Sequence, residues 1–78
     1  MVSLSEENYL KAIYQLGQQG SLAVSTNAIA KKIESKASSV TDMIKKLAEK
    51  SLANYVKYQG VSLTEKGRLA AALVVRKH

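Results

Sequence analysis

Few residues of this chain could do chemistry. The sequence of 78 residues has no cysteine and a single histidine, His78, which is its last residue. Its six acidic residues are scattered along the chain, and no glycine-rich phosphate loop is present. Catalysis needs an acid, a base or a nucleophile poised in a pocket. The sequence therefore predicts that the chain is not an enzyme.

Residues 36–50 have a different chemistry, which is suited to binding. Val40, Ile44 and Leu47 recur at helical spacing, so a helix here would have one apolar face able to dock on a core. The other face begins with small polar residues and continues with lysines. The residues of this helix that we predict to contact DNA are Lys36, Ala37, Ser38, Ser39, Thr41, Asp42, Lys45 and Lys46.

Such a helix suits the major groove of double-stranded DNA. Small side chains in the first turn allow close approach, and the backbone N–H groups of that turn favour a phosphate. The groove is wide enough to admit a helix, and lysines along the flank would meet the neighbouring phosphates. An ordinary solvated amphipathic helix has the same pattern, so the neighbouring elements must distinguish the two interpretations.

The positive charge of the chain is unevenly distributed. The formal net charge is +6, with residues 1–30 at −1, residues 31–56 at +3 and residues 57–78 at +4. The excess of cations lies in the predicted DNA-contacting helix and after it, which favours a polyanionic partner. A basic segment with no particular partner is the alternative. No apolar run approaches the roughly 20 residues of a membrane span, and we expect a cytoplasmic protein.

Two helices precede this stretch and must position it. Ser3 can cap the first, with Glu6 three residues later completing a capping box, and Ser5 is a rival cap. Gly17 and Gly20 are expected to end this helix. The side chains expected to face the core are Leu4, Tyr9, Leu10, Ala12, Ile13 and Leu16.

The second helix and the turn after it predict a helix-turn-helix. A short apolar link over residues 22–24, which could form a strand of a few residues, leads to Ser25, which can cap a helix from Thr26 to about Glu34. A tight turn then leads into the predicted DNA-contacting helix, as in a helix-turn-helix, although the glycine often found in that turn is absent. We expect further DNA contacts from the start of this second helix, at Ser25, Thr26 and Asn27.

A hairpin follows the three helices. Residues 52–56 and 61–63 alternate in polarity, and Gly60 can take the positive φ that the turn between them requires. The tip carries a cation, an aromatic ring and an amide, which suits a wing that touches the phosphate backbone, although an ordinary polar turn would look the same. The predicted contacts of the wing are Lys57, Tyr58 and Gln59.

A last helix completes a winged helix-turn-helix. Thr64 can cap it, and it contains Leu69, Ala70, Leu73 and Val74. The order helix, helix, helix, hairpin, helix predicts a mainly α fold with a small β-hairpin, in one domain over residues 1–78. Because this helix reaches the end of the chain without a C-cap, we expect the chain to be the N-terminal fragment of a longer regulator.

Four short stretches together resemble a known family. Residues 7–14 read ENYLKAIY, residues 38–47 SSVTDMIKKL, residues 63–68 LTEKGR and residues 75–78 VRKH. In this order and at this spacing they resemble the N-terminal domain of the diphtheria toxin repressors, a family of metal-dependent repressors that includes the manganese transport regulators. The resemblance implies sequence-specific binding to a double-stranded DNA operator by a homodimer of the full-length protein.

The resemblance also implies where a metal ligand would be found. Family members use a residue of the first helix and the histidine of the last stretch, which correspond here to Asn8 and His78. Relatives have methionine or aspartate at the position of Asn8, and manganese-type relatives have glutamate at the position of Lys11. A neutral amide binds transition metals weakly and an ammonium group cannot bind them. No metal is expected in this fragment, whereas manganese or iron is expected in the full-length protein.

Two other functions fit the same fold. The winged helix could be a protein-interaction module whose basic face meets an acidic partner, or it could belong to a transcription regulator that does not depend on metal. Salt dependence of binding to random DNA distinguishes the first of these from a DNA-binding domain.

Overall fold

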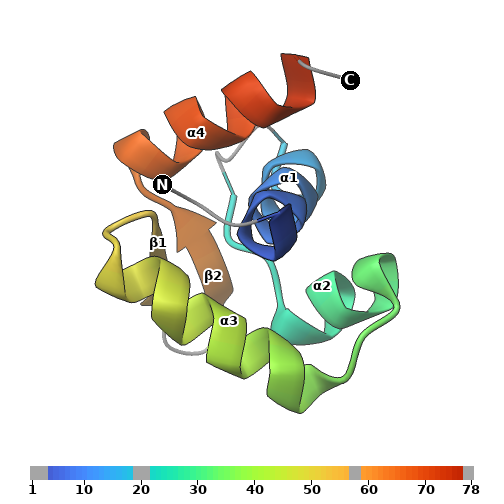
Figure 1. Ribbon diagram of the computed structural model, residues 1–78. Coiled ribbons are helices and arrows are strands. Elements are labelled where there is room, and N and C mark those ends of the chain that lie inside the picture. Colours follow the sequence, from blue (N-terminus) through green and yellow to red (C-terminus); the bar gives the residue numbers. More distant parts are fainter. Residues whose placement is uncertain (1–3, 19–21, 57–58, 77–78) are drawn as a thin grey trace.

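The computed structural model describes residues 4–18, 22–56 and 59–76. The elements are α1 (Leu4–Leu16), α2 (Thr26–Ile33), α3 (Ala37–Glu49), β1 (Ala53–Val56), β2 (Gly60–Leu63) and α4 (Glu65–Arg76). α1 lies between α4 on one side and α2 with α3 on the other, and the hairpin closes the side between α3 and α4 (Figure 1). This arrangement confirms the predicted winged helix-turn-helix, a mainly α fold with a small β-hairpin.

The core forms around α1, which packs against all three other helices and against β2. Leu10 and Ile13 of α1 are fully buried, together with Ile29, Val40, Leu47 and Val61 from the surrounding elements. These residues form one continuous cluster. α1 is therefore the central support on which α2 and α3 are held.

The ends of α1 correct one expectation. Leu4 and Leu16, which we predicted to face the core, are 74% and 38% exposed. They are the first and last residues of the helix, and the elements packed on α1 bury its middle instead. The predicted cap Ser3 lies outside the described residues.

The hairpin is attached to the chain segment that precedes α2. β1 and β2 pair antiparallel, with Ala53 opposite Leu63 and Val56 opposite Gly60. Two strands alone are marginally stable in water, but Val24 and Val61 exchange two backbone hydrogen bonds of 2.7 Å each. The predicted strand over residues 22–24 is thus a single bridge, and it ties the hairpin to the residue just before the cap of α2.

Gly60 is required in this arrangement for two reasons. Its φ is +122°, a conformation that other residues rarely adopt. A Cβ atom at this position would also overlap the carbonyl group of Val24. The sequence prediction of a positive φ at Gly60 is confirmed, and the close approach to Val24 adds a second constraint.

Three described residues that follow helices have a left-handed backbone and are not glycine; the first, Gln18, follows α1 with φ 52°. Glu34 follows α2 with φ 60°, and Ser51 follows α3 with φ 61°. A left-handed residue at the end of a helix lets backbone N–H groups bond back to the last carbonyl groups, and here Ser35 donates to Ala30 at 2.9 Å. Glu34 thus takes the conformation of the glycine that the helix-turn-helix turn lacks.

α4 packs on α1 through small residues. Ala71 and Val74 are buried, whereas Leu69 and Leu73 are 64% and 59% exposed. Gly67 is buried, and a Cβ atom there would overlap the carbonyl oxygen of Leu52. The absence of a side chain at Gly67 therefore lets the first turn of α4 approach the start of the hairpin.

Candidate nucleic-acid interface

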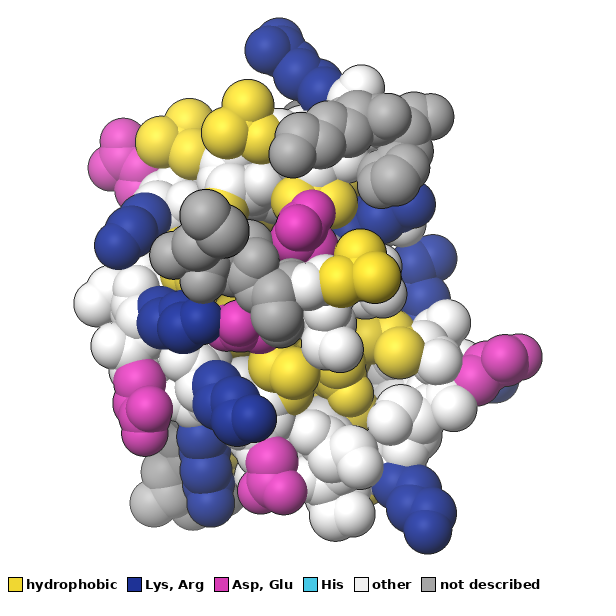
Figure 2. Space-filling view, viewed as in Figure 1, with side chains coloured by type: hydrophobic (Ala, Val, Ile, Leu, Met, Phe, Trp, Pro, Cys, Tyr) yellow, Lys and Arg dark blue, Asp and Glu magenta, His cyan; other side chains and the backbone are white. Residues whose placement is uncertain are grey.

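α3 presents the two faces that its sequence predicts. Val40 and Leu47 are fully buried and Ile44 is 4% exposed, so these three residues fix the rotation of the helix on the core. All the predicted contacts on α3 are exposed to solvent, namely Lys36, Ala37, Ser38, Ser39, Thr41, Asp42, Lys45 and Lys46. In Figure 2, lysine and arginine side chains alternate with acidic ones over the part of the surface that α3 occupies in Figure 1.

The N-terminal turn of α3 is not capped by the side chain of its N-cap residue. Lys36 makes no side-chain cap hydrogen bond, so the first N–H groups of the helix have no side-chain acceptor from that residue. The hydroxyl group of Thr41 donates to the carbonyl oxygen of Ala37 at 3.1 Å. Because that hydroxyl proton is used within the helix, Thr41 offers mainly its methyl group to a partner.

The start of α2 is capped as predicted. Ser25 is extended, and its hydroxyl oxygen accepts from the backbone N–H of Ala28 at 3.1 Å. Asn27 is exposed and Thr26 is half-buried. The backbone N–H groups of Thr26 and Asn27 lie in the first turn, where no intrahelical acceptor exists.

The wing is described only in part. Gln59 is exposed, and its backbone N–H donates to the carbonyl oxygen of Val56 at 3.0 Å. Lys57 and Tyr58, the other two predicted contacts, lie outside the described residues. The wing contacts therefore stay a prediction.

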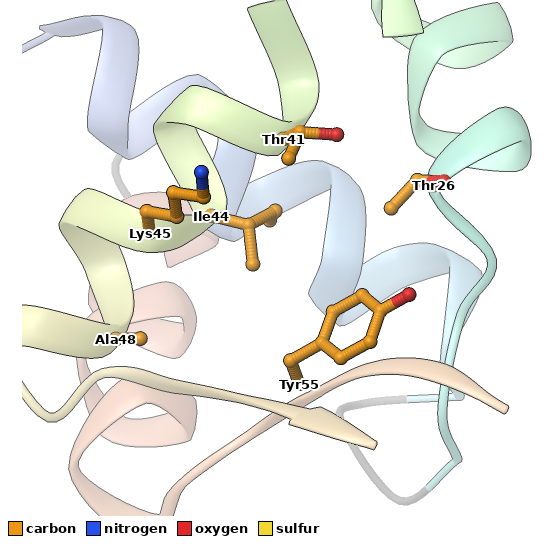
Figure 3. Close-up of a pocket in the computed structure, with 6 residues that line it drawn as sticks. All are labelled: Thr26, Thr41, Ile44, Lys45, Ala48 and Tyr55. Atoms are coloured by element: carbon orange, nitrogen blue, oxygen red, sulfur yellow. The ribbon is translucent and has the colours of Figure 1, made fainter. Parts of the chain in front are cut away.

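A hollow of about 340 Å³ lies between α2, α3 and β1 (Figure 3). It brings together three of the predicted contacts, Thr26 of α2 with Thr41 and Lys45 of α3. Ile44 and Ala48 of α3 also line it, and so does Tyr55 of β1. The ring of Tyr55 stands in the hollow with its hydroxyl group directed toward Thr26 (Figure 3).

Sequence reasoning missed two features of the structure. Tyr55 was assigned only to a strand, although it is 65% exposed. The carboxylate of Glu6, a residue 5% exposed, binds the ammonium group of Lys50 at 2.7–2.8 Å. This ion pair ties the first turn of α1 to the residue that follows α3. The aromatic side chain of Tyr55 within the alternating pattern of the strand could have marked it as a candidate contact. No local pattern in the sequence pairs Glu6 with Lys50.

The residues at the expected metal position do not fit a metal ion. Asn8 is exposed on α1, and Lys11 lies one turn further on. Both line a second hollow together with Lys32 of α2. Two ammonium groups beside one neutral amide disfavour a divalent cation. Within residues 4–18, 22–56 and 59–76, no group of three or more histidine, cysteine, aspartate or glutamate residues could hold a metal, and His78 lies outside these ranges.

The fold and the open face of α3 define a winged-helix DNA-binding domain. The chain belongs to the family described as iron dependent repressor, N-terminal DNA binding domain, whose sequence profile matches residues 1–61.

None of the helices that the structure describes is long and apolar enough to cross a membrane.

The chain is also similar to individual transcription regulators. It is 39% identical over 77 residues to an uncharacterized HTH-type transcriptional regulator of Methanocaldococcus jannaschii, covering 99% of this chain and 62% of that protein. It is 36% identical over 78 residues to the HTH-type transcriptional regulator MntR of Oceanobacillus iheyensis, covering 100% of this chain and 52% of that protein. The chain thus spans about half to three-fifths of the length of these relatives.

A solved structure agrees in both sequence and fold. The manganese regulator SloR matches with a TM-score of 0.76 and 38% sequence identity, over 94% of this chain and 34% of that chain. The predicted family is therefore confirmed, and the chain is a DNA-binding domain of a family of metal-dependent repressors rather than an enzyme.

Proposed function

We propose that this chain binds one half of a double-stranded DNA operator, with α3 in the major groove and the start of α2 on the phosphate backbone. The observation that carries this proposal is the outward face of α3, where eight predicted contacts are exposed while Val40, Ile44 and Leu47 are buried. Family membership indicates that the partner is DNA, and the orientation of α3 indicates which surface would contact it.

The residues of this surface divide into two groups. Lys45 and Lys46 lie along the flank of α3, where they would meet phosphates and position the domain without reading sequence. Ala37 and Thr41 can offer methyl contacts to thymine, and Asp42 can accept from a cytosine amino group. The small side chains of Ser38 and Ser39 let the helix tip approach the base edges.

Salt dependence tests the proposal directly. Anisotropy titrations of a random duplex at several salt concentrations give the log–log slope of affinity against salt. Lys45→Ala and Lys46→Ala should each lower this slope by about 0.9, and should weaken specific and random binding equally. Lys66→Ala, an exposed lysine of α4, is a matched control that should leave the slope unchanged. Slopes unaltered in all three variants would favour the protein-partner alternative.

For the full-length protein, we propose a cytoplasmic homodimer controlled by manganese or iron. The support is the family description and the manganese regulator SloR among the relatives. The resemblance points to Asn8 and His78 as ligands from this chain, whereas the lysines beside Asn8 oppose a cation there. Two candidate ligands cannot complete a site, so this chain should bind DNA weakly and without response to metal. A stoichiometric gain in affinity on adding manganese or ferrous ion to the chain with operator DNA would overturn this.

A regulator without metal control is the second candidate. The observation that favours it is the position of Lys11 and Lys32 beside Asn8, since their charges oppose a cation. The full-length protein decides between the two candidates. If manganese and iron leave its operator affinity unchanged, control by metal has been lost.

A further inference from the structure

Tyr55 lies on the inner face of the hairpin but is not covered by the core. Directly opposed residues of an antiparallel pair share one face of the sheet, and Tyr55 is opposite Val61. Val61 is fully buried, and Ala53 and Leu63 at the other end of the same face are buried too, whereas Tyr55 is 65% exposed. The core thus ends before Tyr55, and the ring projects into the hollow beside α3.

The wall of the hollow is partly apolar and partly polar. Ile44, Ala48 and the ring of Tyr55 supply apolar surface, while Thr26 supplies a hydroxyl group and Lys45 a cation. None of the described residues that line it is acidic. The N-terminus of α2, which begins at Thr26, adds partial positive charge at the same rim. The hollow therefore suits a ligand with one apolar part and one anionic part.

We propose that this hollow holds one deoxyribose–phosphate unit of the DNA backbone. The Tyr55 ring packs against the sugar, and the Tyr55 hydroxyl group, Thr26 and Lys45 bind the phosphate. The inference deepens the proposed function and rests on it, because the hollow is continuous with the proposed contacts of α2 and α3. A phosphate at this point would fix the distance between the wing and the helix in the groove.

Because Tyr55 is uncharged, its contact can be distinguished from that of a lysine by the salt dependence of DNA affinity. A lysine that meets a phosphate releases counterions and so changes the salt slope. A tyrosine contact adds packing and one hydrogen bond without releasing a counterion. Loss of Tyr55 should therefore lower affinity at every salt concentration by the same factor, and equally for specific and random sequences.

The experiment compares Tyr55→Ala and Tyr55→Phe with the unaltered chain. Binding to a random duplex is measured by anisotropy over a series of salt concentrations. Tyr55→Ala should weaken binding roughly five- to tenfold and Tyr55→Phe about threefold, both with an unchanged salt slope. Asn54→Ala is the matched control, because Asn54 is the exposed neighbour on the opposite face of β1. Circular dichroism of each variant checks that the fold is kept.

A double-mutant cycle tests whether the contacts share one phosphate. If Tyr55 and Lys45 bind the same group, the effects of Tyr55→Phe and Lys45→Ala should be non-additive. Additive effects would place the two side chains on different phosphates and overturn the single-unit arrangement.

The outcomes separate this inference from the proposed function. If the unaltered chain fails to bind duplex DNA, the proposed function falls and this inference falls with it. If the unaltered chain binds but Tyr55→Ala behaves like Asn54→Ala, only the inference falls. A loss confined to one operator sequence would make Tyr55 a base contact and overturn its assignment to the backbone.

Discussion

Asp42 is the residue at which the proposed interface is most easily tested. It is exposed one position after Thr41, on the outward face of α3. A carboxylate near phosphates is electrostatically unfavourable, so its contribution at this place would be to sequence choice, through acceptance from a cytosine amino group.

We therefore expect Asp42→Asn to change the preferred base rather than only the affinity. An amide can donate as well as accept, and it pairs best with adenine. Selection from a randomised duplex library, run in parallel with the unaltered chain, measures the preference. Asp42→Asn selecting the same sequence with a uniformly higher affinity would mean that Asp42 faces phosphates, and the proposed orientation of α3 would be wrong.

The turn between α2 and α3 depends on Glu34, whose left-handed backbone conformation is strained. A residue with a side chain loses roughly 1–2 kcal/mol in the left-handed region, whereas glycine does not. Replacing Glu34 with glycine would remove this strain. Part of the gain in stability is offset, because glycine has more conformational freedom to lose when the chain folds.

Glu34→Gly should accordingly stabilise the fold by about 0.5–1 kcal/mol. Urea titration followed by circular dichroism measures the free energy of unfolding. Glu34→Gln removes the charge but keeps the strain, so it should change stability by less than about 0.5 kcal/mol. A lower unfolding free energy for Glu34→Gly would contradict the strain argument.

Gly60 should tolerate no side chain. Gly60→Ala forces alanine into a φ of +122° and drives its Cβ atom into the carbonyl group of Val24, so we expect a loss of more than about 2 kcal/mol. Chemical unfolding measures the loss, and Gln59→Ala at the neighbouring exposed position is the control. Equal stabilities of the two variants would show that the hairpin can move away from Val24 freely.

The sequence predicts the elements better than their tertiary contacts. The buried face of α3, the Ser25 cap and the turn at Gly60 follow from local rules of periodicity, capping and backbone conformation. The exposure of Leu4 and the placement of Tyr55 depend on how far the neighbouring elements extend over them. Among the candidate contacts, local rules place those on α3, whereas the hollow exists only once α2, α3 and β1 are packed together.

At the scale of the whole molecule, one ion pair connects the central helix with the end of α3. Glu6 and Lys50 are 44 residues apart in sequence. The Glu6 side chain is 7% exposed and the Lys50 side chain is 44% exposed. The two partners are therefore unequal, because Lys50 can turn into water whereas the Glu6 carboxylate cannot.

This difference in exposure predicts which substitution lowers the free energy of unfolding more. Lys50→Met takes the cation away from a buried carboxylate and should cost about 1–3 kcal/mol, whereas Glu6→Gln keeps the side-chain shape and should cost about 1 kcal/mol or less. The double variant should be more stable than the sum of the two losses implies. Thermal unfolding of the four proteins measures the differences. A larger loss for Glu6→Gln would show that Glu6 contributes mainly through contacts other than Lys50.

The Val24–Val61 bridge has a consequence for how DNA shape is read. Because it ties the hairpin to the start of α2, the wing and that helix cannot separate without breaking two short hydrogen bonds. If the domain binds DNA as proposed, we expect the hairpin and the start of α2 to keep their spacing, so that changes in groove width fall mainly on the DNA. We expect operator positions that no side chain touches to matter through the energy needed to deform them. Flexible pyrimidine–purine steps there should be favoured over stiff ones wherever the groove must change its width.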